Sequence, residues 1–540
     1  MCAPVTDEER EADVVRFLEQ ATLGPTEALV QEVKAKGIAA WLDEQIPMNI
    51  TRYTQYPFWL PPMDNTKCQD DPTPPVTPEN FCFSLNRSAG PVAWEFYRQS
   101  RTAPDQLRMR MAHVWHQIFV LNLGEPTYGI AEFEQRLRDH AFGTFENLLI
   151  KYALSPQLGN YQNWVNNRPE HDGIKPNENF ARELMQLFTI GVSGLNDDAS
   201  LTLDAKGQRI PTYGQSDIET LARILTGYAF PPQPGYTPGF GNGPYYFGDM
   251  VPFDAFHDSG LKSALAGRIL FPAGGGADYE FRALIRALVE HPNAPPFIAR
   301  QLIQKTVTSS PSPGYVARVT AVFKNNGLGV RGDLAAVTKA ILLDPEARGA
   351  RKIDTEYGRL REPALFWTAM IRALDVTTDG ASPFEQASNS GQSLFAPPTV
   401  FNYYPSDYTL AGGSIPGPEF GIYGTAEFLM RANQVNDLLF NVDQSWAVDP
   451  IAAYGWGPRA WMANATGTPS PSLAAFLPDA GNADALVSRL NRLFLHGTMT
   501  DDVRATIVNA VNKLNATESL RRVKLAVDLI LISIDYQVQK

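Results

Sequence analysis

Apolar residues recur at helical spacing along most of the 540-residue chain, and this pattern constrains the fold more than any other feature of the sequence. Strand-like alternation is scarce. Helix start signals precede several of the periodic stretches, namely Thr6 with Glu9, Ser216 with Glu219, and Thr144. The sequence therefore predicts a mainly α fold: a large multi-helix assembly with long irregular loops and at most a small β-hairpin, in which residues 245–247 pair with 252–256.

Three irregular regions interrupt the helical series, at residues 47–90, 229–260 and 376–425. Loops longer than about 12–15 residues are uncommon in compact domains unless they have a function, so we expect the functional site near these regions. The helical main domain, 1–350, is predicted to carry that site. A helical C-terminal part, 351–540, packs on it or forms one unit with it.

Composition excludes several classes of protein. The chain has 46 Lys and Arg against 58 Asp and Glu, a net charge of −12, and contains no basic cluster. Nucleic acids and anionic membranes require a dense basic surface, so neither is an expected partner. No apolar run approaches the ~20 residues that cross a bilayer, so we predict no transmembrane segment.

The cysteines and the start of the chain bear on location. Cys68 and Cys82 flank a Pro- and Asp-rich segment without helix or strand pattern, and we predict a disulfide between them; two ordinary thiols are the alternative. The first residues lack a leader's charged and apolar regions, so either the protein stays in the cytoplasm or a leader has been removed. Cys2 fits the lipid-bearing residue of a trimmed lipoprotein or a residue left by cloning. We favour an extracytoplasmic location, whether periplasmic, secreted or lipid-anchored.

Two predicted helices carry polar residues on buried faces. The helix at 107–120 is apolar nearly all round, so His116 lies inside the protein as a hydrogen-bonded structural residue, a ligand or a catalytic group. In the helix that begins near Asn177, Glu178 and Arg182 are four residues apart and suit an exposed ion pair. Glu183 lies at the edge of the apolar stripe, where a carboxyl is either partly desolvated or held in a boundary salt bridge.

Several segments resemble a known family when they are taken in order along the chain. They are 16–26, 115–119, 138–143, 177–191, 222–228, 257–258, 361–363, 394–398 and 535–539. Together they resemble the large bacterial family catalogued as domain of unknown function eighteen hundred. The resemblance implies a mostly helical, exported protein, often encoded beside an exported family that looks like the alkaline phosphatase and sulfatase superfamily. It implies no established reaction.

The resemblance also selects candidate site residues, because these match positions in the family's motifs: Asn177, Glu178, Asn179, Arg182, Glu183, His116, His257 and Asp258. The family frequently has a second histidine two residues after the first, where this chain has Ile118. A metal site that needs both histidines is therefore in doubt in this chain.

We favour an exported enzyme that hydrolyses an extracellular polymer, a polysaccharide in the first place, with carboxylates as acid and base. The predicted catalytic residues are Glu178, Glu183, His116, His257 and Asp258. The predicted substrate-binding residues are Arg182, Asn177, Asn179, Tyr228, Tyr245, Tyr246, Tyr403 and Tyr404. Aromatic loops of this kind either stack against sugar rings or pack the loops together.

Two alternatives remain open. A metal-dependent hydrolase or oxidoreductase would hold one divalent metal ion with His116, Glu183 and His257, although these come from three distant segments. A non-enzymatic cell-surface scaffold would use the same loops to bind a partner, such as the phosphatase- or sulfatase-like neighbour, with the buried polar residues as a structural network. Haem-attachment, nucleotide-loop, Gly-x-Ser-x-Gly and Cys-x-x-Cys motifs are absent from the sequence.

Overall fold

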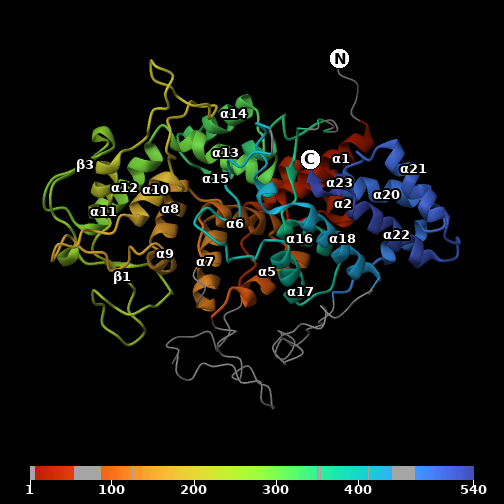
Figure 1. Ribbon diagram of the computed structural model, residues 1–540, viewed down its shortest axis with the longest axis horizontal. Helices are drawn as coiled ribbons and strands as arrows, with labels where there is room; N and C mark the ends of the chain where they lie inside the picture. Colours follow the sequence, from red (N-terminus) through yellow and green to blue (C-terminus); the bar gives the residue numbers. More distant parts are fainter. Residues whose placement is uncertain are drawn as a thin grey trace, which may run out of the picture.

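Helices dominate the structure, a computed structural model that describes residues 6–53, 87–122, 126–349, 352, 354, 356–410, 413–440 and 469–540. Within these ranges, the strands form three short antiparallel pairs (Figure 1), and the other β pairing consists of isolated bridges. The prediction of a mainly α protein is therefore confirmed. Cys2, Cys68 and Cys82 lie outside the described residues, and the predictions made for them lie outside as well.

The helices fall into an N-terminal and a C-terminal group. The N-terminal group comprises α1 (Asp7–Ala21), α2 (Glu27–Lys36), α3 (Ile38–Gln45), α5 (Gly90–Thr102), α6 (Gln106–Ile118), α7 (Thr127–His140), α8 (Phe145–Ala153), α9 (Pro156–Tyr161), α10 (Asn179–Gln186), α11 (Gln215–Ile224), α12 (Ala277–Glu290), α13 (Ala294–Thr306), α14 (Pro313–Lys324) and α15 (Leu334–Leu342). The C-terminal group comprises α16 (Pro363–Ala373), α17 (Ala381–Asn389), α18 (Thr425–Phe440), α20 (Ala483–Leu495), α21 (Asp501–Asn512), α22 (Ser519–Leu531) and α23 (Ile534–Gln537).

The remaining regular elements are short. The 3₁₀ helices are η3 (Asp254–Phe256), η4 (Leu265–Gly267), η5 (Pro418–Ile422) and η7 (Ala474–Asp479). The strands are β1 (Tyr228–Ala229), β2 (Val251–Pro252), β3 (Lys262–Ala264), β4 (Ile269–Phe271), β5 (Arg359–Leu360) and β6 (Val538–Gln539). They pair as β1 with β2, β3 with β4, and β5 with β6.

Local side-chain chemistry determines where several helices begin. Thr6 and Glu9 form the predicted capping box of α1, and Thr144 accepts a hydrogen bond from the backbone of α8 as expected. The start predicted at Ser216 is wrong. Gly214 precedes α11 and its N–H donates to Asp217 at 2.8 Å, so Ser216 already lies within the first turn.

The predicted hairpin is wrong in its partner strand. Tyr228 and Ala229 pair with Pro252 and Val251 in place of residues 245–247. The rings of that segment are used for packing, since Phe247 stacks on Tyr128 with ring centroids 4.9 Å apart. The hairpin of β3 and β4 has no counterpart among the predictions.

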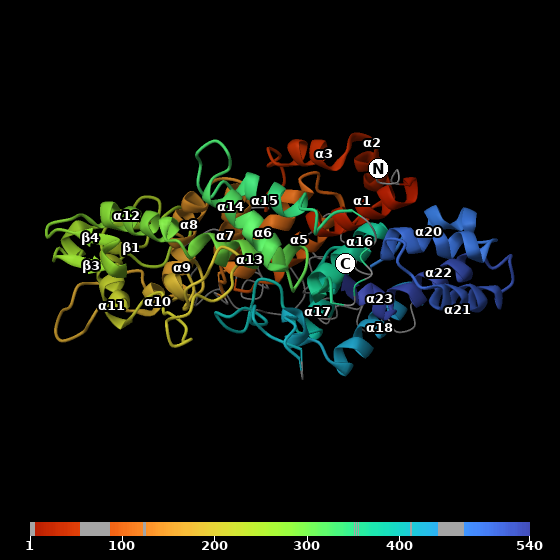
Figure 2. The same ribbon diagram turned by 90° about the horizontal axis from the view of Figure 1, so that it is seen from above.

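The buried apolar side chains form two clusters, and α6 contributes to both. Trp115 belongs to the first cluster, which is built mainly from the N-terminal helices, and Met109 belongs to the second, which includes α16, α20 and α22. The molecule is elongated, with α11 and α12 at one end and α20 to α22 at the other (Figure 2). Helix α5 packs on α16 and α17, so the two parts interlock, and the boundary near residue 350 stays a prediction.

Candidate functional site

Helix α6 is buried on all sides, as the sequence predicts, and His113, His116 and Gln117 are among its buried polar residues. One of them, His116, is fully buried, with Nδ1 2.7 Å from Glu134 Oε1 on α7. The edge of its ring meets Phe395 at a centroid distance of 5.1 Å. Its Nε2 has no hydrogen-bond partner among the described residues. His116 is therefore held by one carboxylate and one aromatic ring.

His113 and Gln117 of α6 contact the carboxylate of Glu362, which is completely buried at the N-terminus of α16. His113 Nε2 lies 2.8 Å from Glu362 Oε1, and Gln117 Nε2 donates to both carboxylate oxygens at 2.7 and 2.8 Å. Gln392 and the Tyr404 hydroxyl donate at 3.0 and 2.6 Å. We call these five residues the Glu362 network.

The charge of Glu362 is stabilised by its neighbours. Burial by itself raises the pKa of a carboxyl, but His113, Arg359 and the Tyr404 hydroxyl together hold the pKa of Glu362 well below its usual range. Burial lowers the pKa of His113, which favours a neutral imidazole. Glu362 is therefore an ionised carboxylate within a dry, hydrogen-bonded site.

Lys305, near the end of α13, lies beside this network. Its backbone carbonyl accepts hydrogen bonds from Arg110 and Arg359, both at 2.6 Å. Its Nζ donates to Gln117 Oε1 at 3.3 Å and lies 5.7 Å from the centre of the Tyr404 ring. Burial lowers the pKa of Lys305 to about 8, because the nearby carboxylates only partly offset the desolvation. This amine consequently gives up its proton close to neutral pH.

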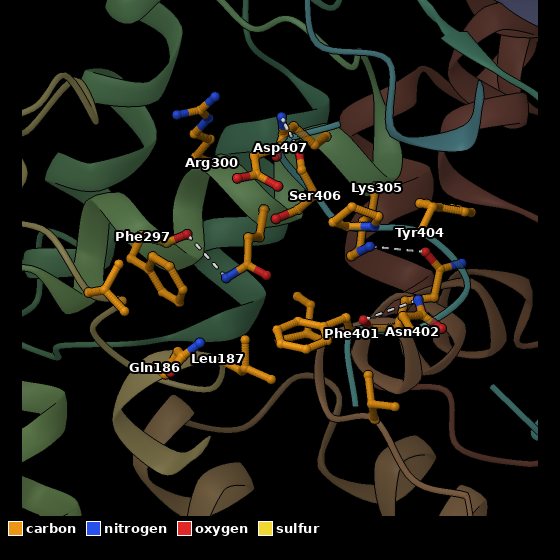
Figure 3. Close-up of a pocket in the computed structure, with 18 of the residues that line it drawn as sticks. Gln186, Leu187, Phe297, Arg300, Lys305, Phe401, Asn402, Tyr404, Ser406 and Asp407 are labelled. Carbon is orange, nitrogen blue, oxygen red and sulfur yellow. Dashed lines mark hydrogen bonds between the residues drawn. The ribbon is translucent and has the colours of Figure 1, made fainter. Parts of the chain in front are cut away.

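A pocket of about 330 Å³ opens above Lys305, and we call it the α13 pocket (Figure 3). Its walls come from the end of α6, the end of α10 with residues 187–195, α13, and the segment 400–407. Arg300 and Lys305 line it from α13, and the Phe401 ring, on a residue 53% exposed, lines it from the segment 400–407. The lining combines amides (Gln117, Gln186, Gln301, Gln304, Asn402), aromatic rings (Phe297, Phe401, Tyr404) and charged groups (Arg300, Lys305, Asp407).

A second, smaller pocket of about 190 Å³ lies near the N-terminal end of α10, and we call it the carboxylate pocket. Its lining includes Glu170, Lys175, Glu178, Glu219, Arg223 and Asp258. It thus brings together two of the predicted catalytic residues, Glu178 and Asp258.

The groups in the carboxylate pocket differ in how firmly they are held. Arg223 binds both oxygens of Asp258, each at 2.9 Å. Burial raises the pKa of Asp258, but the hydrogen bonds from Arg223 and the Gly260 backbone outweigh it and lower the pKa. Glu178 is 3.4 Å from Arg182, in the ion pair expected from their spacing. The Nε2 of Gln215 joins Glu178 to Glu219, at 3.0 and 3.5 Å.

The remaining predicted catalytic residues lie elsewhere. His257 Nε2 is 3.1 Å from Glu280, and its Nδ1 is 2.9 Å from the carbonyl of Thr226. Lys262 binds the same Glu280 at 2.8 Å, which makes a buried triad. Glu183 is buried on α10, and burial raises its pKa. Its Oε2 has no hydrogen-bond partner among the described residues.

His116, Glu183 and His257 therefore sit in three separate environments. Within the part of the chain that the structure describes, no three His, Cys, Asp or Glu side chains are grouped so as to hold a metal ion. The ligand set of the metal-dependent alternative is thus not assembled there.

Four of the eight predicted substrate-binding residues are buried, namely Tyr228, Tyr246, Tyr403 and Tyr404, whereas Asn177 and Asn179 are exposed. Tyr228 contacts Trp164 at a centroid distance of 5.3 Å, and Tyr246 is buried beside Phe230. Tyr245 contacts Phe247, Asn179 donates to Gln162 at 2.6 Å, Asn177 accepts from the Asn179 backbone, and the Tyr403 hydroxyl donates to the Ser393 carbonyl. Of this set, Tyr404 lines the α13 pocket.

The site residues predicted from the sequence do not include Gln117, Glu362, Arg300 or Lys305. Gln117 and Glu362 stood within segments that carry the family resemblance, and this was the available signal for them. Lys305 stood in a helical stretch without a motif, and its partners come from residues far along the chain, such as Arg110 and Arg359.

The fold and the two pockets define a mainly α-helical protein whose α10 has a polar pocket near each end. The chain belongs to the family described as "Protein of unknown function (DUF1800)", whose family model matches residues 16–538. The resemblance seen in the sequence is thereby confirmed. No curated protein and no solved structure matches the chain. Among the described residues, no helix combines the length and the apolar character that a membrane crossing requires.

Proposed function

We propose that this protein is an exported enzyme that hydrolyses an extracellular polysaccharide bound along α10. The observation that carries the proposal is the carboxylate pair of Glu178 and Glu219, which share hydrogen bonds from one nitrogen of Gln215. The distance between Glu178 Oε2 and Glu219 Oε1 therefore cannot exceed the sum of these two hydrogen-bond lengths. Glycosidases that retain configuration use two carboxyl groups about 5–5.5 Å apart, as acid and as nucleophile.

The α13 pocket supplies the binding surface for the same polymer. Glu178 immediately precedes α10 and Gln186 is its last residue, so the two pockets are separated by about 12 Å of helix. A chain of a few sugar units is long enough to reach both pockets. Amide side chains suit sugar hydroxyls, and the exposed ring of Phe401 offers a face on which the apolar side of a sugar packs.

The experiment is depolymerisation of a panel of polysaccharides, measured as new reducing ends. Glu178→Gln and Glu219→Gln are each expected to lower kcat by about 10²- to 10⁴-fold, because each removes a carboxyl that acts in proton transfer or attack. Glu32→Gln, on an exposed glutamate of α2, is the matched control and is expected to retain full activity. Cleavage that persists in both pocket variants would overturn this assignment.

A binding protein without catalytic activity is the second candidate function. The observation in its favour is that His116, His257 and Asp258 are each engaged by a charged partner, as in a structural network. In that case polysaccharides bind without being cut, and His116→Ala lowers the free energy of unfolding while binding in the folded fraction is retained. Loss of cleavage in a stable Glu178→Gln variant would instead identify an enzyme.

A further inference from the structure

Behind the α13 pocket lies a buried cluster, which we call the pocket floor, with more cations than carboxylates. Arg110, Arg359 and Lys305 are buried in it with Glu362 and Glu419, and of these residues Lys305 alone lines the pocket. Arg359 lies 2.8 Å from Glu419 and 3.8 Å from Glu362, so both carboxylates are already engaged by one guanidinium. Guanidinium groups keep their protons in proteins, so a protonated Lys305 leaves the floor with one uncompensated positive charge.

The elements around Lys305 contribute both signs of charge. The titratable and charged groups that face it or line the pocket with it are Arg110 and His113 from α6, Arg300 from α13, Arg359 and Glu362 at β5 and the start of α16, Glu419 from η5, and Tyr404 and Asp407 from the segment 400–407. Of these, His113 is close to Glu362 and is kept neutral by burial. His113 therefore does not change the count of three buried cations against two buried carboxylates.

A buried uncompensated charge is costly, and it can be relieved in two ways. Lys305 can release its proton, in keeping with its pKa of about 8, or an anion from outside can pair with it. An ammonium group has three N–H donors, and Gln117 accepts one of them. Lys305 is 6% exposed and lines the pocket, so an anion bound in the pocket lies next to this residue.

Arg300 extends the same positive surface. It lies on α13 five residues before Lys305 and also lines the pocket, where burial lowers its pKa. Asp407 is the carboxylate that partly compensates it, and this residue is exposed on the segment 400–407. Both cations of α13 therefore line the pocket, and Asp407 lies between them in the view of Figure 3.

We propose that the α13 pocket binds the acidic group of an anionic sugar, a carboxylate or a sulfate ester, against Lys305 and Arg300. This inference rests on the proposed function and names the substrate class as acidic polysaccharides. Anion binding completes the charge balance of the pocket floor, and a neutral sugar leaves it incomplete. The pocket thus discriminates between polymers that have the same linkage and a different charge.

The test is calorimetric titration with three oligosaccharides of one linkage: a uronic acid oligomer, a sulfated oligomer and a neutral oligomer. Acidic oligomers are expected to bind at least about tenfold more tightly than the neutral one, and less tightly as salt is raised. At pH 8, in buffers of different ionisation enthalpy, binding is expected to take up about half a proton per site, because ion pairing raises the pKa of Lys305 from about 8.

Lys305→Met is expected to abolish both the preference and the proton uptake, because it keeps an unbranched side chain of similar size and removes the charge. Arg300→Gln is expected to reduce the preference and leave the proton uptake in place, which provides a second variant if the first folds poorly. Lys324→Met, at a half-buried lysine paired with Asp197, is the matched control and is expected to behave as the wild type.

The outcomes separate this inference from the proposed function. Equal affinity for acidic and neutral oligomers, without proton uptake, overturns the inference while cleavage at Glu178 and Glu219 still stands. Tighter binding of the uronic acid or of the sulfated oligomer supports it and identifies the acidic group. Selective acid binding by a protein that cleaves none of the polymers supports the inference and overturns the proposed hydrolysis.

Discussion

Glu362 and Lys305 illustrate how single residues are controlled by partners far away in the sequence. Glu362 accepts hydrogen bonds from α6, from Gln392 and from Tyr404. The backbone carbonyl of Lys305 accepts hydrogen bonds from guanidinium groups of α6 and β5. The residues of each of these pairs are far apart in the sequence, so no short segment of the chain contains the whole site. The charge state of each residue is a property of the assembled core.

Glu362→Gln is expected to lower the free energy of unfolding by about 3–5 kcal/mol at pH 7, since it removes a buried negative charge near Arg359 and weakens the hydrogen bonds that Gln117, Gln392 and Tyr404 donate to it. Folding depresses the pKa of Glu362, so its stabilisation is complete above its usual value of 4.5 and is lost as the pH falls below it. Urea unfolding of both proteins at pH 7 and pH 4 measures the effect.

The difference between the two proteins should therefore shrink at pH 4. Glu178→Gln is the matched control at a partly exposed glutamate, and it is expected to change stability by no more than about 0.5 kcal/mol. A Glu362→Gln variant as stable as the wild type at pH 7 would contradict the network.

The pKa of Asp528 on α22 is shifted in the opposite direction from that of Glu362. It is 6% exposed, its Oδ1 has no hydrogen-bond partner among the described residues, and burial raises its pKa to about 6. The folded state therefore retains this proton to higher pH than the unfolded chain, whose value is near 3.8, and stability falls as the pH rises between them. Above pH 6 the folded protein carries a buried, poorly solvated carboxylate.

Asp528→Asn is expected to raise the free energy of unfolding by about 2 kcal/mol at pH 7 and to have little effect at pH 4. Thermal or urea unfolding at the two pH values gives the comparison. The exposed Asp502, on α21, provides a control in Asp502→Asn, with an expected change of about 0.5 kcal/mol or less. Equal stabilisation by Asp528→Asn at both pH values would show that charge is not the cause.

At the scale of elements, helix existence could be predicted and helix pairing could not. The capping box of α1 is a contact between residues three apart, so the sequence displays it directly. The partner of β2 was mispredicted because Tyr246 and Phe247 are used in aromatic packing, which depends on residues such as Tyr128. The sequence likewise does not predict where two helices approach closely or which glycine lies at such a contact.

Gly380, just before α17, permits such an approach to α5. Its φ is +95°, and a Cβ built there would lie 1.9 Å from the carbonyl oxygen of Trp94. Gly380→Ala is expected to destabilise the protein by about 1–3 kcal/mol beyond the cost of a positive φ, because α5 and α17 must move apart. The measurement is the free energy of unfolding.

Gly37 separates the two contributions to that cost. Its φ is +87°, and a Cβ there meets nothing within 4 Å. Gly37→Ala therefore reports backbone strain without a steric contact, about 1–3 kcal/mol. If the two alanine variants lose the same stability, the contact between α5 and α17 is not tight.

At the scale of the whole molecule, the sequence predicts the mainly α class, the all-round burial of α6 and the ion pair of Glu178 with Arg182. It does not predict which polar residues meet, because contacts such as His113 with Glu362 join residues 249 positions apart. The two pockets likewise arise from segments that become neighbours only after the helices pack. This is why Glu178 and Asp258 share a pocket while His116 and His257 occupy separate networks.

The central claim is that a polysaccharide lies along α10 and reaches both pockets. Hydrogen–deuterium exchange of the protein with and without a bound acidic polysaccharide tests it most directly, with the Glu178→Gln variant used to prevent cleavage. The account predicts slower exchange in peptides that cover residues 170–195 and 400–407, and unchanged exchange in α20 to α22. Protection confined to regions outside both pockets, in a protein that binds the polymer, would contradict it.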